Sequence, residues 1–298
     1  MTSVKPLRDG DAVNAILLPL ALCLLSAITV AATNMFVKRG GDVLSARMIV
    51  SIAMALSVLP FAPFVPLPTG PLWGALALSV IVHWGYQFAM IRALHRGDLS
   101  LVFPVMRGLA PLLAALLALM TLRENPGIWG WIGLIMATCS IIVFALPEKR
   151  ADGTGLPKRD ALIWAGLTAV GIAAYSVVDA RGVRMADNPM TFVVWLFLFD
   201  WIGITAAMLF VRRGNIWSGV RPQIIGGTIG GFLGTISYGA ALLAMSLADV
   251  AYVTAIRETS VVFAAIMGAV FLKESFGRRR IVAAAVLAVG LLMLQIGA

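Results

Sequence analysis

Three charged residues fall inside otherwise apolar stretches, where their side chains could bind charged groups of a ligand. Arg107 lies within residues 99–121, and the adjacent Arg257 and Glu258 divide residues 250–272 into apolar pieces that are each too short to cross a bilayer. A charge at the centre of a membrane helix costs roughly 3 kcal/mol on insertion scales, so such residues usually face a protein interior or a wet cavity. These three side chains could contact the two ends of a zwitterionic substrate. The alternatives are an ion pair between two helices, or charges near the membrane surface whose ends extend into water.

A polar stripe follows one face of residues 71–94. His83, Tyr86, Gln87 and Met90 occur at relative positions 0, 3, 4 and 7, which places them on one side of a helix. Such a stripe in an apolar helix is typical of a cavity wall, and the alternative is a hydrogen-bonded patch between helices. Polar and aromatic residues of other stretches could complete a cavity for a flat or apolar side chain, and these candidates are Asn34, Trp164, Tyr175 and Tyr238. A Trp near a membrane boundary is also common as an interfacial anchor.

Two further acidic residues, Asp179 and Asp200, suggest an alternative function, an intramembrane aspartyl protease in which two carboxylates share one proton. They occur in the segments VVDARG and FLFDWIG, without the Gly-x-Gly-Asp context of those proteases, and Asp179 is expected at the end of a helix near the membrane surface. No GxSxG nucleophile, HExxH helix or phosphate-binding loop is present. The cysteines Cys23 and Cys139 have no metal-ligand or CxxC spacing. We therefore expect no catalytic residue, no metal and no cofactor.

The elements that must position these residues are membrane-spanning helices. Of the 298 residues 60% are apolar and only 12% are charged, too few charges to cover the surface of a soluble protein. The formal net charge is +9, but the basic residues lie between apolar stretches, where they face lipid head groups rather than nucleic acid. Apolar spans of about 20 residues predict an all-α membrane protein of ten transmembrane helices. The predicted spans are 12–37, 43–60, 71–94, 99–121, 126–146, 161–180, 189–211, 222–246, 250–272 and 278–297.

Local signals indicate where several of these helices begin and bend. Asn125 and Asn188 each precede a proline, an arrangement that starts a helix, and Asp98 and Asp249 are predicted to cap the fourth and ninth helices. Pro104 and Pro111 disrupt the fourth helix. The ninth helix has Thr254 and Val261 at the corresponding positions, so a kink is expected in the fourth helix alone.

The chain also shows an internal duplication. Residues 104–127 read PVMRGLAPLLAALLALMTLRENPG and residues 254–277 read TAIRETSVVFAAIMGAVFLKESFG, so that a shift of 150 residues aligns Arg107 with Arg257 and Glu124 with Glu274. We predict two five-helix repeats, residues 1–148 and 161–298, joined by a linker over 149–160. Because five is odd, the second repeat enters the membrane inverted, which is the plan of secondary transporters with a central cavity between the repeats.

The distribution of basic residues predicts the orientation in the membrane. Loops on the side of the linker hold most of the Lys and Arg residues, among them Arg92, Arg96, Lys149 and Arg212, whereas the opposite loops hold few. By the positive-inside rule the linker lies in the cytoplasm and both termini lie outside. An inside N-terminus is the less favoured alternative. No cleavable signal peptide is expected, because the uncharged stretch from Ala12 to Val37 is too long for one.

Ten spans in a 5+5 repeat, with each half containing a helix that ends in LRENPG or LKESFG, resemble the EamA family of the drug/metabolite transporter superfamily. Within that family the chain is most similar to bacterial aromatic amino-acid exporters of the YddG type. The resemblance implies a monomer in the bacterial inner membrane, with its fifth and tenth helices peripheral. It also implies export of amino acids or similar small molecules by alternating access, while other metabolites or drugs are alternative cargo. The first helix lacks the acidic residue that small proton-coupled members of the superfamily carry there, so proton antiport by that route is not expected.

Overall fold

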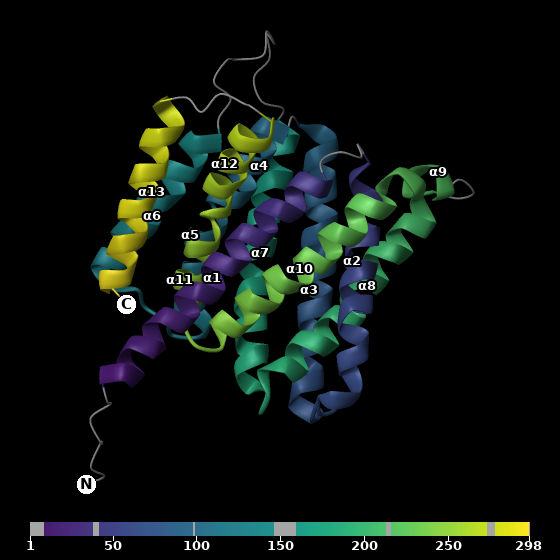
Figure 1. Ribbon diagram of the computed structural model, residues 1–298, viewed down its shortest axis with the longest axis horizontal. Coiled ribbons are helices and arrows are strands. Elements are labelled where there is room, and N and C mark those ends of the chain that lie inside the picture. The colour runs from purple at the N-terminus through teal and green to yellow at the C-terminus, as the bar shows by residue number, and fades with distance from the viewer. Residues whose placement is uncertain are drawn as a thin grey trace.

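The computed structural model describes residues 9–37, 42–97, 99–145, 159–212, 216–272 and 278–297, and all regular elements among them are helical (Figure 1). The α-helices are α1 Asp9–Val37, α2 Val43–Val58, α3 Gly70–Arg96, α4 Leu99–Gly108, α5 Ala110–Thr121, α6 Gly127–Ala145, α7 Arg159–Met185, α8 Pro189–Val211, α9 Ile216–Val220, α10 Ile224–Met245, α11 Val250–Arg257, α12 Ser260–Leu272 and α13 Arg278–Gly297, with 3₁₀ turns at Leu59–Phe64 (η2) and Arg221–Gln223 (η3). In the described residues six helical segments are long and apolar enough to cross a membrane, and shorter apolar helices accompany them.

Each predicted span corresponds to one helix or to consecutive helices, so the ten-helix, all-α prediction is confirmed. The fourth span is the pair α4 and α5, and the ninth is the pair α11 and α12. The bounds differ most at α7, which continues to Met185 instead of ending at residue 180. Asp179 therefore lies inside a helix and is fully buried, so the prediction that it ends a helix is wrong.

The two halves pack as inverted copies. Helix α6 lies antiparallel to α13 at one edge of the bundle (Figure 1), and their backbones approach so closely that a Cβ on Gly133 would lie 2.3 Å from the carbonyl oxygen of Gly290. Further along the same pair of helices, the Ser140 hydroxyl donates to the carbonyl of Ala283. A shift of 150 residues converts Gly133 into Ala283 and Ser140 into Gly290, so the two contacts are images of each other. The duplication inferred from the fourth and ninth helices therefore extends to this pair.

The central bundle also interleaves the two halves. Helix α3 of the first half packs along α7 of the second, and α1 packs along α10, which is the equivalent pair. The start of α1 and the end of α13 lie at the lower end of the bundle in Figure 1, which we call the termini side. The opposite end, where α6 ends and α7 begins, we call the linker side. An even number of crossings is the reason that both chain ends reach the same side.

Both the fourth and the ninth spans are broken, so the expectation of a kink in only one of them is wrong. In the first half the break lies at Leu109, before Pro111. The ninth span, in the second half, contains no proline. There the backbone N–H groups of Glu258 and Thr259 donate to the carbonyls of Ala255 and Ile256 at 3.1 and 3.0 Å, a 3₁₀ pattern that ends α11. The Thr259 hydroxyl donates to the Ile256 carbonyl as well (2.7 Å), and such side-chain bonds compete with regular helix bonds.

Candidate functional site

A cavity of about 170 Å³ lies between the two repeats, next to both helix breaks. It is bounded by α1, α2, α3, α4, α7, α8, α10 and α11, so both halves contribute to its wall. Seven of the ten residues predicted from the sequence line it, namely His83, Tyr86, Gln87, Arg107, Tyr175, Tyr238 and Arg257. Whether they contact a substrate stays a prediction.

Arg107, at the end of α4, is neutralised by the other half of the protein. Its guanidinium lies 3.1 Å from a carboxylate oxygen of Glu258 and donates to the Ser260 hydroxyl at 3.4 Å. Glu258 is only 4% exposed, and one of its oxygens has no further hydrogen-bond partner among the described residues. The alternative of an internal ion pair between two helices therefore applies to Arg107 and Glu258.

Arg257, at the end of α11, has different surroundings. Its Nε donates to the Ser26 hydroxyl of α1 at 2.9 Å, and its guanidinium lies over the Tyr238 ring at 5.3 Å. Among the residues that the structure describes, no carboxylate lies within ion-pair distance of this side chain. A buried guanidinium that faces a cavity without a carboxylate partner is suited to bind the carboxylate of a ligand.

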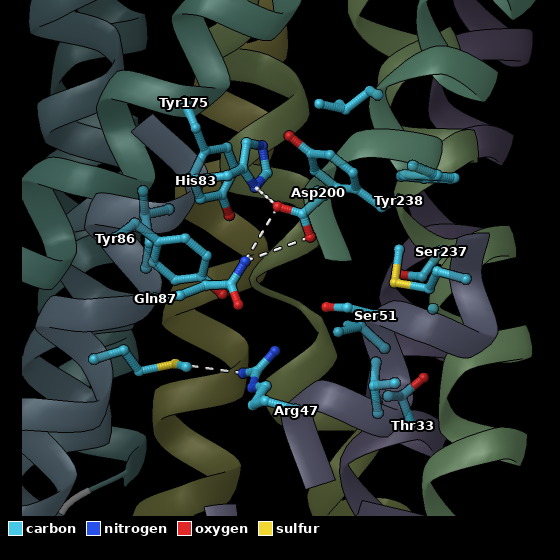
Figure 2. A pocket seen from close by; sticks show the side chains of 18 of the residues that line it. Thr33, Arg47, Ser51, His83, Tyr86, Gln87, Tyr175, Asp200, Ser237 and Tyr238 are labelled. Carbon is cyan, nitrogen blue, oxygen red and sulfur yellow. Dashed lines mark hydrogen bonds and ion pairs between the residues drawn. The ribbon is translucent and has the colours of Figure 1, made fainter. Parts of the chain in front are cut away.

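Also in the cavity wall, a histidine lies between two carboxylates, of which Figure 2 shows Asp200. His83 Nε2 is 2.9 Å from Asp179, while its Nδ1 is 3.9 Å from Asp200. Asp179 is fully buried behind the wall, and it also accepts hydrogen bonds from the hydroxyls of Ser79 and Tyr238. Asp200 faces the cavity and accepts from the Gln87 amide at 3.1 Å. It is thus placed to accept from a cationic group in the cavity.

Aromatic rings form another part of the cavity wall, next to His83 and Arg257. The His83 ring stacks on Tyr175 with centroids 4.4 Å apart, and Tyr175 in turn lies 5.0 Å from Tyr86 and 5.8 Å from Tyr238. Phe197 continues this wall against Tyr238. The cavity therefore combines cationic groups, a carboxylate and an aromatic surface.

Three of the predicted site residues are not among those lining the cavity. Trp164 lies eleven positions before Tyr175, about 16 Å along α7, and it packs instead on Phe88 and under the guanidinium of Arg96 on the linker side. Glu258 lies beside the cavity and pairs with Arg107. The side chain of Asn34 lies outside the described residues.

Sequence reasoning missed two charged residues that line the cavity. Arg47, near the start of α2, donates to the sulfur of Met90 at 3.4 Å (Figure 2), and Asp200 was considered only as part of a protease. Arg47 carried a usable signal, because it is a charge within an apolar span like Arg107. The hydroxyls of Thr33, Ser51 and Ser237 also line the cavity, and small polar residues of this kind are too common in membrane helices to be singled out.

The termini side is closed by apolar packing and by a polar network. The apolar cluster draws on α3, α5, α7, α8, α10 and α11, with Leu76, Ala118, Val183, Phe192, Met245 and Val250 fully or nearly fully buried. At its outer end Glu124 pairs with Arg184, and its carboxylate accepts from the backbone N–H of Val250 at 2.7 Å. Arg184 also donates to the carbonyls of Met245 and Ala248 at 2.7 and 2.8 Å.

This network changes the expected capping of the ninth helix. Asp249 occupies the N-cap position of α11 but makes no capping hydrogen bond, and Glu124 of the other repeat supplies the acceptor. The predicted caps at Asn125 and Asn188 are confirmed, since their side chains accept from the backbone N–H groups of Gly127 and Met190. Asp98 lies outside the described residues. Burial and the neighbouring Glu124 raise the pKa of the Asp249 carboxyl, and Arg184 partly opposes that shift.

Comparison with known proteins agrees with this architecture. Residues 17–146 and 160–296 each match the EamA-like transporter family. A chloroplastic WAT1-related protein of Arabidopsis thaliana is 22% identical over 238 residues, which are 77% of this chain and 57% of that protein, so the chain spans little more than half of its length. A crystal structure of 20% sequence identity covers 95% of this chain and 96% of its own at a TM-score of 0.75, which supports the fold. With both halves matched, the chain belongs to the EamA-like transporter family.

Proposed function

We propose that this protein exports amino acids with aromatic or other hydrophobic side chains across a bacterial inner membrane by alternating access. The observation that carries the proposal is the set of groups around the cavity. Arg257 has no carboxylate partner among the described residues and is available for the cargo's carboxylate, Asp200 for its ammonium group, and the Tyr86, Tyr175 and Tyr238 rings for its side chain.

The arrangement of the bundle favours loading from the linker side. The cavity-lining residues Arg47 and Met90 lie toward the linker-side ends of α2 and α3, whereas the termini side is filled by the apolar cluster and the Glu124–Arg184 network. If the basic linker side faces the cytoplasm, as the positive-inside rule predicts, this conformation receives cargo from the cytoplasm. Release then requires the network between the repeats to open.

The geometry does not favour the aspartyl protease. Two catalytic aspartates must share a proton directly, yet Asp179 and Asp200 lie on opposite nitrogens of the His83 ring. Asp179 is fully buried and is committed to Ser79, His83 and Tyr238. The arrangement of these carboxylates therefore suits the binding of a cationic group better than it suits aspartyl-protease hydrolysis.

The proposal is tested by counterflow in proteoliposomes. Vesicles that contain the purified protein are loaded with unlabelled L-phenylalanine, and the entry of radiolabelled L-phenylalanine, L-tryptophan, L-leucine and L-glutamate is followed. We expect entry of labelled phenylalanine and tryptophan above protein-free vesicles and little entry of glutamate, whose charged side chain would lie against the aromatic wall. Absence of counterflow for all amino acids would overturn the proposal.

A variant pair tests the assignment of the binding groups. Tyr86→Ala removes part of the aromatic wall and should lower phenylalanine counterflow without lowering the amount of protein in the membrane. Trp164→Ala is the matched control, because Trp164 is an aromatic residue near the same helices but outside the cavity. Equal loss in both variants would contradict the assigned wall.

A further inference from the structure

The chain of Asp179, His83 and Asp200 has no evident structural need for two carboxylates. Asp179 alone already satisfies one nitrogen of the imidazole and orients the ring, with Ser79 and Tyr238 as its other partners. Asp200 lies 3.9 Å from the second nitrogen, beyond hydrogen-bond length, and is held instead by Gln87. Asp200 therefore connects the buried pair to the cavity.

A neutral imidazole can donate from only one nitrogen, whereas a protonated ring donates from both. With a neutral ring the three groups hold two negative charges in a poorly solvated place, and one added positive charge would compensate half of them. That charge can come from a proton on His83, which then donates to both carboxylates. It can also come from a ligand ammonium group at Asp200. The two cations repel each other at this distance, so they should exclude each other.

We propose that Asp179, His83 and Asp200 form a proton-binding site whose proton exchanges with the ammonium group of the cargo, which makes the protein a proton-coupled antiporter. This inference rests on the proposed export function, because the competing cation is part of the cargo. On the termini side a proton from water binds His83 as the cargo leaves Asp200. On the linker side the next cargo molecule displaces that proton into water.

The other groups around the ring are compatible with this role. Titratable and charged neighbours face the site from several helices, namely Tyr86 on α3, Tyr175 on α7, Tyr238 on α10, and the arginines Arg47, Arg107 and Arg257 of the same cavity. Arg107 is neutralised by Glu258, and Arg257 lies over Tyr238. Arg47 donates to Met90 and has no carboxylate partner among the described residues. Its positive charge can compete with the ammonium group of the cargo for Asp200, and so Arg47 is varied in the test below.

Direct observation of His83 is feasible because the chain has only two histidines. In the His95→Gln protein, labelled histidine reports on His83 alone, and its ring signals can be followed by nuclear magnetic resonance in detergent micelles as a function of pH. We expect a titration between about pH 5 and 8, where histidine changes charge, and a lower midpoint when L-phenylalanine is added. The control ligand 3-phenylpropionate has the same ring and carboxylate but no ammonium group, and should not lower the midpoint.

Two variants locate the exchange. Asp200→Asn should abolish the phenylalanine-dependent shift, since the ammonium site is lost, whereas Arg47→Gln should leave the direction of the shift unchanged. A ring that stays in one protonation state over the whole range would overturn the proposal. So would a midpoint that phenylalanine does not move although phenylalanine is transported.

A transport assay tests proton coupling independently of the titration. Vesicles are made acid inside and alkaline outside, with valinomycin and equal potassium on both sides to hold the voltage at zero. For exchange of one proton per phenylalanine, a gradient of one pH unit should accumulate labelled phenylalanine about tenfold. His95→Gln, at an exposed position on the linker side, should accumulate it equally, and His83→Gln should not exceed the equilibrium distribution.

The outcomes separate the two proposals. Phenylalanine counterflow without accumulation along the pH gradient would overturn proton coupling and leave the export function standing. Absence of counterflow for every amino acid would remove the export function itself. Accumulation that survives in His83→Gln would place the coupling proton elsewhere and overturn the assigned site.

Discussion

The two broken helices occupy equivalent positions in the two repeats, yet their arginines have different partners. Arg107 of the first repeat is bound by Glu258 and Ser260 of the second. Among the described residues, the partners of Arg257 of the second repeat are the hydroxyl of Ser26 and the ring of Tyr238. The duplication thus supplies a symmetrical scaffold in which one copy of the arginine joins the halves and the other is the one that we propose to bind a ligand.

The sequence difference behind this asymmetry lies one residue after each arginine. The position equivalent to Glu258 is Gly108, where a Cβ would lie 2.8 Å from Ile142 of α6. The first repeat therefore has no room for the carboxylate that the second repeat provides. A single Gly-to-Glu difference between the copies therefore provides Arg107 with its ion-pair partner, and the proposed binding role falls to Arg257.

The largest expected effect comes from removing one member of the structural pair. Arg107→Gln leaves Glu258 buried without its partner, which should destabilise the protein by about 3–5 kcal/mol. The double variant Arg107→Gln/Glu258→Gln removes both charges and should recover most of that loss. Thermal unfolding in detergent and the yield of folded protein measure both effects. If the double variant is as unstable as the single one, the ion pair with Glu258 is not the way in which Arg107 stabilises the protein.

Arg257→Gln should act on binding rather than on folding. A hydrogen bond to a charged group contributes roughly 1.5–3 kcal/mol, so the KM for phenylalanine should rise about 10- to 100-fold at nearly unchanged unfolding temperature. Arg257→Lys keeps the charge without the forked geometry, so its KM should lie between those of the wild type and Arg257→Gln. The carboxylate 3-phenylpropionate should inhibit the wild type and not Arg257→Gln. Unchanged KM values would remove Arg257 from the site.

The contact between α6 and α13 tests a place where the repeats are used symmetrically. Gly133→Ala places a methyl group against the backbone of Gly290, and overpacking of this kind costs about 1–3 kcal/mol. Gly85→Ala is the matched control, since a Cβ there has nothing within 4 Å. The unfolding temperature should fall in Gly133→Ala and not in Gly85→Ala. Because no residue of α6 or α13 is among those that line the cavity, KM should not change in Gly133→Ala.

Glu124→Ala should loosen the start of α11, the helix that ends in Arg257. The substitution removes both the ion pair with Arg184 and the acceptor for the Val250 N–H group, and the loss of a cap costs about 1 kcal/mol. Hydrogen exchange of the first turn of α11 should accelerate roughly fivefold. Asp187→Asn, exposed on the same side of the bundle, should leave that exchange unchanged. Equal protection in Glu124→Ala would show that the network does not hold this helix.

The smallest effect is expected at Asp249. Its raised pKa means that the folded state disfavours the charged carboxylate, so stability falls as the pH rises from the ordinary Asp value through the folded pKa. Asp249→Asn removes that charge without loss of a capping bond and should raise the unfolding temperature slightly at neutral pH. The difference should vanish below about pH 4, where the carboxyl is protonated in both states. A variant that is less stable at neutral pH would contradict this sign.

Much of the fold could be predicted from the sequence because apolar length, Asn-Pro starts and a 150-residue repeat are local or linear signals. The helix break at Thr259 could not be predicted in this way. Its cause is a 3₁₀ turn supported by a side-chain hydrogen bond, whereas proline was the only breaker considered. The extension of α7 past residue 180 was missed because Asp179 was read as a helix end, although its charge is satisfied by side chains of two other helices.

The lining of the cavity was predicted well where a residue type alone indicates a polar interior, as for Arg107, Arg257 and the stripe on α3. It was predicted poorly where the partner decides the role. Glu258 and Arg257 are adjacent in the sequence, yet Glu258 pairs with Arg107, about 150 positions away. That pairing leaves Arg257 without a carboxylate partner among the described residues, and pairing across the repeats is set by the tertiary structure.

The most direct test of this account compares phenylalanine counterflow in Arg257→Gln with that in the double variant Arg107→Gln/Glu258→Gln, each corrected for the amount of folded protein in the vesicles. We expect the double variant to retain counterflow, because its two charges neutralise each other, and Arg257→Gln to lose most of it at low phenylalanine concentration. Retained counterflow in Arg257→Gln together with its loss in the double variant would contradict the assignment of Arg257 as the ligand-binding arginine.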